Sequence, residues 1–179
     1  MVETAERDKP HVARNTQIER AWEALAAIPD PELPIVSIVE LGIVRSIRAA
    51  RDGLVVDVTP TYSACPAIEA IIRDIRDALD ESGIGGARIE LKLSPPWTSD
   101  CIAPEAKNRL RQFGIAPPHA AVARIDVTRI RPLRHAAAVA CPRCASTHTR
   151  RVSEFGSTPC KAHYRCDDCL EPFDYFKPL

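Results

Sequence analysis

Residues 54–93, LVVDVTPTYSACPAIEAIIRDIRDALDESGIGGARIELKL, decide the fold of the first part of the chain. The stretch begins with a β-branched run at 54–59, and the apolar residues of 66–82 then recur at the spacing of one face of a helix. The alternating run at 88–93 predicts a second, half-buried strand. Because a helix separates the two strands, they can lie parallel in one sheet, joined by a right-handed crossover.

The segment upstream of this unit adds a strand to the same sheet. Branched side chains fill 36–40 and 43–48, and Asp52-Gly53 follows them as a turn signal. The sequence therefore predicts a β-hairpin that leads into the strand at 54–59.

Two further helices are predicted at the ends of this region. A capping-box pattern that starts at Thr16 predicts a helix that ends before Pro29. A second helix is predicted over 100–113, with Ser99 or Thr98 as its N-cap.

These elements predict an α+β fold in which a small mixed β-sheet packs against helices. We expect this domain to cover 16–115, after a disordered N-terminal tail over 1–15. Residues 116–138 are predicted to form a basic, proline-containing linker, and 139–179 a separate zinc-ribbon domain.

Charge and hydropathy limit the class of function. The 24 basic and 24 acidic residues give a net charge of zero, which argues against nucleic acid as the main partner. The apolar runs are shorter than the ~18 residues of a membrane span, and the start of the chain lacks the apolar segment of a secretion signal. We therefore expect a cytoplasmic protein with no membrane partner.

The predicted linker departs from this balance of charge. It is either a solvated connector, which is the simpler interpretation, or a docking strip for an acidic partner. Its basic residues are Arg124, Arg129, Arg131 and Arg134.

Four of the seven cysteines form two CxxC pairs, Cys141 with Cys144 and Cys166 with Cys169. Two such knuckles, 21 residues apart, match the tetrahedral four-thiolate site of a zinc ribbon. The ion replaces a core that a segment of about forty residues cannot build alone. We predict one structural zinc, with a single iron or a cluster as the alternative.

Cys160 is an additional thiol close to these pairs in the sequence. We expect it to be an accessory thiol that lies near the metal without binding it, although it could also replace a ligand or be a buried small residue. His148 and His163 are potential ligands that four cysteines make unnecessary. The aromatic residues of 171–178, EPFDYFKP, are predicted to form the small core of the ribbon.

Cys65 stands apart from the paired cysteines. It directly precedes Pro66, which is favoured at the first position of a helix, so Cys65 is the predicted N-cap. Unpaired amides and the helix dipole favour a thiolate there, which suits a nucleophile or a metal ligand. The alternative is a small buried hydrophobic residue.

Carboxylates occur in two loops that could approach this thiol. Asp30 and Glu32 lie in PDPELP, and Asp100 precedes Cys101 in PWTSDC. If these loops meet at one end of the sheet, carboxylate and thiolate together suit iron. A hydrolytic triad cannot be assembled, since 16–115 contains no histidine.

The motifs together carry a family resemblance. IPDPELPIVSIVELGIV, VTPTYSACPA and LSPPWTSD resemble the SufT-like family linked to iron–sulfur cluster assembly. In combination with CPRC and FGSTPCKAHYRCDDCLEPFDYFK, the chain resembles the PaaD/PaaJ family, the D subunits of the phenylacetyl-CoA epoxidase (phenylacetate-CoA oxygenase) system. The functional motif of the family carries over onto Asp30, Glu32, Thr61 and Cys65, and its ribbon ligands onto the two CxxC pairs. An aromatic residue is expected where this chain has Cys101, so that thiol is left out of the predicted site.

The resemblance implies a role in aerobic phenylacetate degradation. The partners it implies are a carboxylate-bridged di-iron oxygenase subunit and an iron–sulfur flavin reductase. We expect a maturation factor that carries iron or an iron–sulfur cluster transiently at Cys65 and delivers it to these subunits. The alternatives are a subunit that relays electrons through a four-cysteine iron site during turnover, and a zinc-stabilised structural adaptor. A stand-alone enzyme is disfavoured, because the sequence contains no phosphate loop and no nucleophile–base motif.

Overall fold

The computed structural model describes residues 9–62, 65–118 and 138–178, and it divides the chain into two compact units. The first unit ends at Trp97 and the second begins at Thr98. None of the helices in the described ranges is long and apolar enough to cross a membrane.

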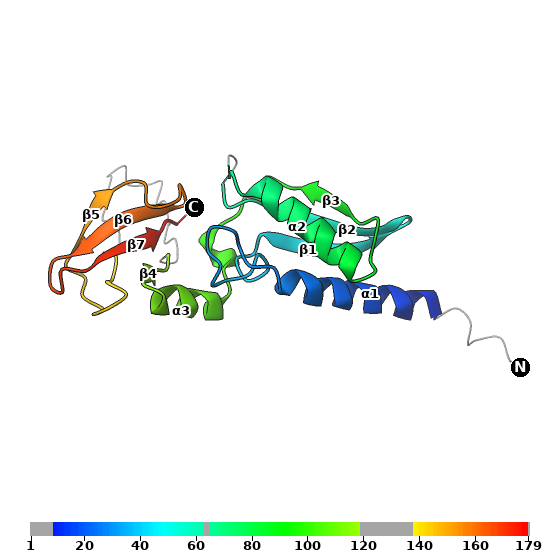
Figure 1. The fold of residues 1–179 in the computed structure, drawn as a ribbon, viewed down its shortest axis with the longest axis horizontal. Coiled ribbons are helices and arrows are strands. Elements are labelled where there is room, and N and C mark those ends of the chain that lie inside the picture. The colour runs from blue at the N-terminus through cyan, green and yellow to red at the C-terminus, as the bar shows by residue number, and fades with distance from the viewer. Residues whose placement is uncertain (1–8, 63–64, 119–137, 179) are drawn as a thin grey trace, which may run out of the picture. The chain divides into compact units, whose positions relative to one another are not determined.

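The first unit is a three-stranded sheet with two helices (Figure 1). Its elements are helix α1 (Lys9–Ala26), strands β1 (Val44–Ala50) and β2 (Gly53–Val58), helix α2 (Ile68–Glu81) and strand β3 (Arg88–Leu91). The strand order is β1-β2-β3, with β1 antiparallel to β2 and β2 parallel to β3. The predicted hairpin and crossover are therefore confirmed.

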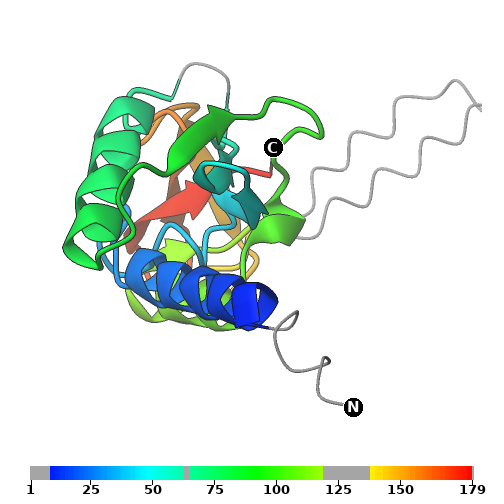
Figure 2. The ribbon, with the colours of Figure 1, turned by 90° about the vertical axis from the view of Figure 1, so that its right-hand side faces the viewer.

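The core of the first unit lies between the helices and the sheet. The face of α2 that carries Ile71, Ile75 and Leu79 is buried, as the helical spacing predicted. Val56 and Val58 of β2 are fully buried as well. Helix α1 contacts both α2 and β1, and α1 and α2 lie side by side (Figures 1 and 2).

Two local predictions in the first unit are wrong. Helix α1 begins at Lys9 rather than at Thr16, which lies inside the helix and is not its cap. Part of the predicted tail is thus helical. Pro10 is compatible with this, because it falls in the first turn, where proline is tolerated. Residues 36–40 form turns instead of a strand, because Ser37 and Glu40 cap each other: each side chain accepts the N–H of the other residue, at 3.2 and 2.9 Å.

The second unit contains a four-stranded sheet (Figure 1). Its elements are a 3₁₀ turn η1 (Ser99–Cys101), helix α3 (Pro104–Gln112) and strands β4 (Ile115–Ala116), β5 (Thr149–Ser153), β6 (Lys161–Cys166) and β7 (Pro172–Phe176). The strand order is β4-β7-β6-β5, in which only the β4–β7 pair is parallel. The predicted fold class, α+β with a C-terminal ribbon, is confirmed.

Helix α3 differs from its prediction in where it begins. Its N-cap is Ala103 and Pro104 is its first residue, because proline lacks the N–H that the first turn leaves unpaired. Thr98 and Ser99 therefore do not cap it. Gly114, with φ of 85°, follows the C-cap and ends the helix.

Helix α3 and strand β4 belong to the unit that holds the ribbon, whereas the sequence grouped them with the first domain. The reason is strand pairing over a long distance in sequence: Ile115 lies opposite Asp174 of β7, and Ala116 opposite Tyr175. The predicted domain boundaries concern independent folding and stay a prediction. Most of the predicted linker, residues 119–137, lies outside the described residues.

Candidate functional site

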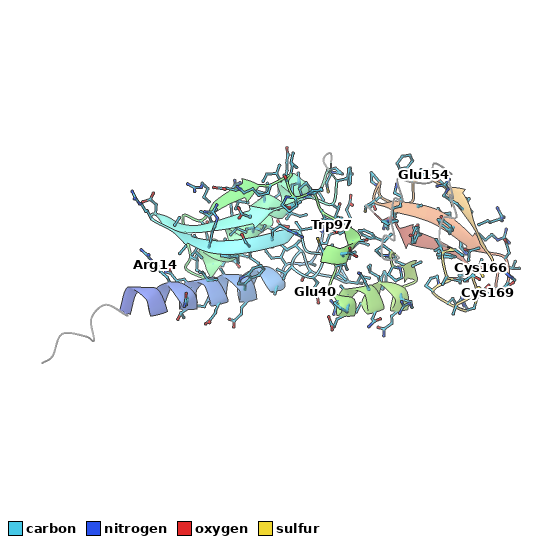
Figure 3. All side chains as sticks on the ribbon, turned by 180° about the vertical axis from the view of Figure 1, so that it is seen from behind. Arg14, Glu40, Trp97, Glu154, Cys166 and Cys169 are labelled. Atoms are coloured by element: carbon cyan, nitrogen blue, oxygen red, sulfur yellow. The ribbon has the colours of Figure 1, made fainter. Side chains whose placement is uncertain are left out.

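The sulfurs of the two CxxC pairs meet at one end of the four-stranded sheet. The Sγ atoms of Cys141, Cys144, Cys166 and Cys169 all lie within 4.8 Å of one another. Those of Cys141 and Cys169 are 3.7 Å apart, and those of Cys144 and Cys166 are 3.6 Å apart. In Figure 3, Cys166 and Cys169 lie close together, away from Glu154 at the other end of β5.

These distances fit a tetrahedral metal ion. A zinc–sulfur bond of about 2.3 Å places the sulfurs of a tetrahedron about 3.8 Å apart. An iron ion bound by four thiolates has the same donor set, so the donor set alone does not select the metal. Cys141 and Cys166 are buried, whereas Cys144 and Cys169 are exposed. One side of a bound ion would therefore face the surface.

Both knuckles have the same backbone form. The N–H of Ala145 donates to the carbonyl of Cys141 at 2.9 Å, which closes the first turn. The residues that follow the second cysteine of each pair, Ala145 and Leu170, have φ of 61° and 64°. The amides of these turns point at sulfur: N–H groups of Cys169 and Asp168 lower the pKa of Cys166 to about 7, whereas burial and the neighbouring sulfurs raise the pKa of Cys169 to about 12. Such amides stabilise the thiolate form that a metal requires.

Asp168 joins the two knuckles by hydrogen bonds. Its Oδ2 accepts the hydroxyl of Ser146 at 2.5 Å, and its Oδ1 lies 3.3 Å from Nδ1 of His148. These two partners, Ser146 first, hold the pKa of the Asp168 carboxyl below its ordinary value. The N–H of Asp167 donates to the carbonyl of His148 at 2.8 Å. We call Ser146, His148 and Asp168 the knuckle clasp.

Among the residues that the structure describes, the four cysteines form the only group of three or more His, Cys, Asp or Glu side chains whose ligand atoms already lie close together. His148 is engaged in the clasp, and Nδ1 of His163 lies 3.4 Å from Oδ1 of Asp174. Cys160 immediately precedes β6, which ends at Cys166, and an extended strand of that length spans about 20 Å. The expectation that Cys160 lies near the metal is therefore wrong: it is buried, with its sulfur 3.0 Å from the Thr158 hydroxyl.

The apolar core of the ribbon lies next to the metal-binding end, as predicted for EPFDYFKP. Phe173 and Tyr175 are buried together with Cys141 and Cys166. The ring of Tyr164 stacks on that of Phe173, with 5.9 Å between the ring centroids. It meets the ring of Tyr175 edge-on, with 5.5 Å between the centroids. This cluster is small, which agrees with an ion that completes the core.

Cys65 occupies a different environment, in the loop that leads into α2. The N-cap of α2 is Ala67, so the prediction that Cys65 caps the helix is wrong. Cys65 lies two residues earlier, and its N–H donates to the carbonyl of Tyr62 at 3.2 Å. The amide of Ala67 nevertheless points at its sulfur.

The pKa of the Cys65 thiol is raised, which is opposite to the direction that the sequence predicted. Burial is the largest cause, and the charges of Glu32 and Asp30 add to it. Hydrogen bonds from the Ala67 amide and the Thr61 side chain act in the other direction and are outweighed. At neutral pH the thiol is therefore protonated and is a weak nucleophile.

Asp30 is positioned by the turn that it organises. It is only 6% exposed, and its Oδ1 accepts the N–H groups of Glu32 at 2.9 Å and Leu33 at 2.8 Å. The turn is tied to the next segment, since the N–H of Asp30 donates to the carbonyl of Val36 at 2.9 Å. The proline-rich stretch PDPELP thus carries two carboxylates whose charges act on the Cys65 thiol.

The loop that carries Asp100 and Cys101 belongs to the second unit, whereas Cys65 and the PDPELP carboxylates belong to the first. Cys101 belongs to η1 in the second unit, where its sulfur lies 3.9 Å from the Thr98 hydroxyl, and Asp100 is exposed. Trp97 ends the first unit, and its Nε1 donates to the carbonyl of Leu41 at 2.8 Å. The tryptophan of this motif therefore has a structural role.

The knuckle clasp was not predicted, because reasoning from the sequence about the ribbon considered thiols and imidazoles but not carboxylates. The signal available was the acidic pair inside Cys-Asp-Asp-Cys. Nothing in the sequence distinguishes Asp168, which bonds both Ser146 and His148, from Asp167, which pairs with Arg150 at 3.2 Å.

Comparison with known proteins gives matches to both parts of the chain. A family of iron–sulfur cluster assembly proteins matches residues 18–91, and the PaaD zinc beta ribbon domain matches 127–177. The putative 1,2-phenylacetyl-CoA epoxidase D subunit of Escherichia coli (strain K12) is 47% identical over 163 residues, which cover 90% of this chain and 93% of that protein.

Two further similarities concern the first part of the chain. An Fe-S protein maturation auxiliary factor of Porphyromonas gingivalis is 36% identical over 84 residues, which cover 46% of this chain and 79% of that protein. The crystal structure of a domain of unknown function, DUF59, from Bacillus anthracis superposes with a TM-score of 0.52 at 26% identity. The match covers 56% of this chain and 96% of that domain.

Proposed function

Because the chain belongs to the family of phenylacetyl-CoA epoxidase D subunits, we propose that it is a maturation factor for the epoxidase system. It binds iron or an iron–sulfur cluster transiently at Cys65 and delivers it to the oxygenase or to its reductase. In this proposal it is an accessory protein of phenylacetate catabolism that is not catalytic alone.

The observation that carries the proposal is the set of groups that act on the Cys65 thiol. Asp30 and Glu32 are close enough for their charges to raise its pKa, and Thr61 hydrogen-bonds it. The same two negative charges attract a cation. Carboxylate and thiolate together form a donor set that suits iron.

The raised pKa of Cys65 suits a carrier that is empty most of the time. The protonated thiol resists oxidation and alkylation, because the thiolate is the reactive form. When a ferrous ion arrives, the sulfur–hydrogen bond is exchanged for a sulfur–iron bond and one proton is released to water. Proton return at the thiol then favours release of the ion to a client with stronger ligands.

The four-cysteine site would have a structural role in this proposal. Its donor set and spacing suit one zinc ion, which supplies a closed tetrahedral site and no redox chemistry. Cys141, Cys144, Cys166 and Cys169 would be the ligands, with the knuckle clasp holding the two turns. Both sites need reduced thiols, so we expect the protein to act in the cytoplasm.

The decisive experiment measures iron in the clients. The oxygenase and reductase subunits are produced with the wild-type chain, with Cys65→Ala, or without the chain, and their iron content and activity are then measured. We expect low iron without the chain and with Cys65→Ala, and normal activity of properly loaded subunits after the chain is removed. Normal iron loading with Cys65→Ala would contradict the proposal.

One observation favours a second function. Because Cys144 and Cys169 are exposed, a redox-active ion at this site would be accessible to electron transfer. A subunit that relays electrons during turnover requires iron in the ribbon and activity that depends on the chain after the clients are loaded. Purified protein that is colourless and contains one zinc would exclude it.

A further inference from the structure

A groove in the second unit lies between the end of α3 and the first knuckle of the ribbon. It consists of two hollows of about 320 and 230 Å³ that share Arg111, Pro142 and Arg143. The pairing of β4 with β7 fixes α3 next to the ribbon sheet, so the two walls belong to one compact unit (Figure 1). We call this feature the α3 groove.

The charge of the α3 groove is predominantly positive. Lys107, Arg111 and Arg143 line it, and Glu171 is the acidic residue among its lining residues. The guanidinium of Arg143 lies 2.8 Å from the Glu171 carboxylate, which leaves Lys107 and Arg111 in excess. Arg111 is exposed, and its guanidinium donates to the neutral side-chain amide of Asn108 at 3.2 Å. A negatively charged ligand would therefore neutralise the excess positive charge of the groove.

The groove also offers apolar surface. Phe113 lies at its edge and is 66% exposed, the largest exposed fraction among the large apolar side chains described. Phe173 also lines this hollow and is part of the buried ribbon core. Prolines line both hollows: Pro142 and Pro172 line the one that holds the two rings, and Pro117 and Pro118 line the other. Aromatic and cationic groups in one hollow are typical of protein interfaces.

We infer that the α3 groove docks an acidic segment, with at least one aromatic or aliphatic side chain, of a partner protein. The carboxylates of the segment would pair with Lys107 and Arg111, and its apolar side chain would cover Phe113. The choice of partner rests on the proposed function: it is a subunit of the epoxidase system, so the groove holds the chain against its client.

The chemistry of the groove excludes two other occupants. The chain's own residues 119–137 contain four arginines and one aspartate, so their charge has the same sign as that of the groove. A nucleic acid would need a wider basic surface than three cations, and the net charge of the whole chain is zero.

Photo-crosslinking on the full zinc-loaded chain tests this inference. The crosslinking amino acid p-benzoylphenylalanine replaces Phe113 in one protein and Phe155 in a matched control, because Phe155 is 63% exposed in the same unit but lies outside the groove. Each protein is irradiated with purified oxygenase or reductase subunits, and the linked peptides are identified by mass spectrometry. We expect links from position 113 to an acidic segment of one subunit, and few from position 155.

Charge reversal then tests the role of the basic residues. Lys107→Glu with Arg111→Glu should reduce the affinity for that subunit at least about tenfold, whereas Arg73→Glu with Arg76→Glu, on the exposed face of α2, should leave it unchanged. Zinc content checks that the ribbon is intact in each variant. Phe113→Ser removes the exposed ring of the groove at a position distant in sequence from the metal ligands. It should also reduce the affinity for that subunit.

Several results would overturn the inference: no link from position 113 to either subunit, equal linking from both positions, a linked segment without excess acid, or binding of nucleic acid in place of the subunit. The outcome is independent of iron transfer. Cys65→Ala should keep the crosslink while iron delivery fails, so a failure of the groove and a failure of the proposed function can be told apart.

Discussion

Four sulfurs in the second unit lie within 4.8 Å of one another, whereas Cys65 in the first unit has carboxylates and a hydroxyl as its neighbours. The four-cysteine site is closed by knuckle turns, backbone amides and the clasp of Asp168. Cys65 is a single half-buried thiol whose pKa is raised. In the proposed function the same atom type serves two purposes: permanent ligation of a structural ion uses several preformed ligands, while transient ligation uses one thiol that is protonated again when the ion leaves.

The largest effect is expected from removing one ligand of the four-cysteine site, which distinguishes it from the single thiol of Cys65. Cys141→Ser should abolish zinc binding and unfold the ribbon, because structural zinc supplies about 10 kcal/mol or more to such domains. The first unit, which has its own core, should keep its NMR spectrum. Zinc content and two-dimensional NMR spectra measure both effects.

Cys160→Ser is the matched control for that variant, since Cys160 is another buried thiol of the ribbon that lies outside the group of metal ligands. It should retain zinc. Loss of zinc in this control would mean that Cys160 is a ligand after all.

An intermediate effect is expected from the knuckle clasp. Asp168→Asn weakens the bonds that join the knuckles, and loss of such supporting groups typically costs about 10–100-fold in metal affinity. Competition with a chromogenic chelator measures the affinity. Asp167→Asn, at the neighbouring exposed aspartate, should change it little; equal effects of the two variants would remove the special role of Asp168.

The smallest effect is expected from the charges around Cys65. Burial is the main cause of its raised pKa and Glu32 contributes next among the raising groups, so Glu32→Gln should lower the pKa only in part. Because alkylation requires the thiolate, the rate at a fixed pH below the pKa should rise about threefold. Peptide-resolved iodoacetamide labelling between about pH 7 and 10 gives the profile.

The sign of this prediction is fixed by the direction of the shift. A raised pKa keeps the thiol protonated to higher pH, and removal of a negative neighbour shifts the whole rate profile toward lower pH. Glu23→Gln, at an exposed position of α1, should leave the profile unchanged. A shift toward higher pH with Glu32→Gln would contradict the arrangement of charges around Cys65.

The features that the sequence predicted correctly depend on short-range patterns. The stripe from Ile71 to Leu79 and the Asp52-Gly53 turn involve neighbours in the chain, so α2 and the hairpin followed from spacing alone. The two CxxC pairs are similarly local, since each knuckle presents two sulfurs by its own turn.

The features that the sequence could not provide depend on contacts across long separations. The protonation of Cys65 is decided by burial and by carboxylates far earlier in the chain, which outweigh the local helix start. The grouping of α3 with the ribbon depends on the pairing of Ile115 with Asp174. Which aspartate of Cys-Asp-Asp-Cys joins the knuckles is likewise a matter of tertiary geometry.

The separate roles of the two thiol sites are tested by following iron-57 and zinc in the same sample. The chain is loaded with ferrous iron, with and without sulfide, under anaerobic conditions and is then mixed with iron-free client subunits. We expect iron to bind the wild-type chain and to move to a client, Cys65→Ala to do neither, and one zinc per chain to stay in place throughout. Iron that binds equally to Cys65→Ala, or that displaces the zinc, would contradict the division of roles between the two sites.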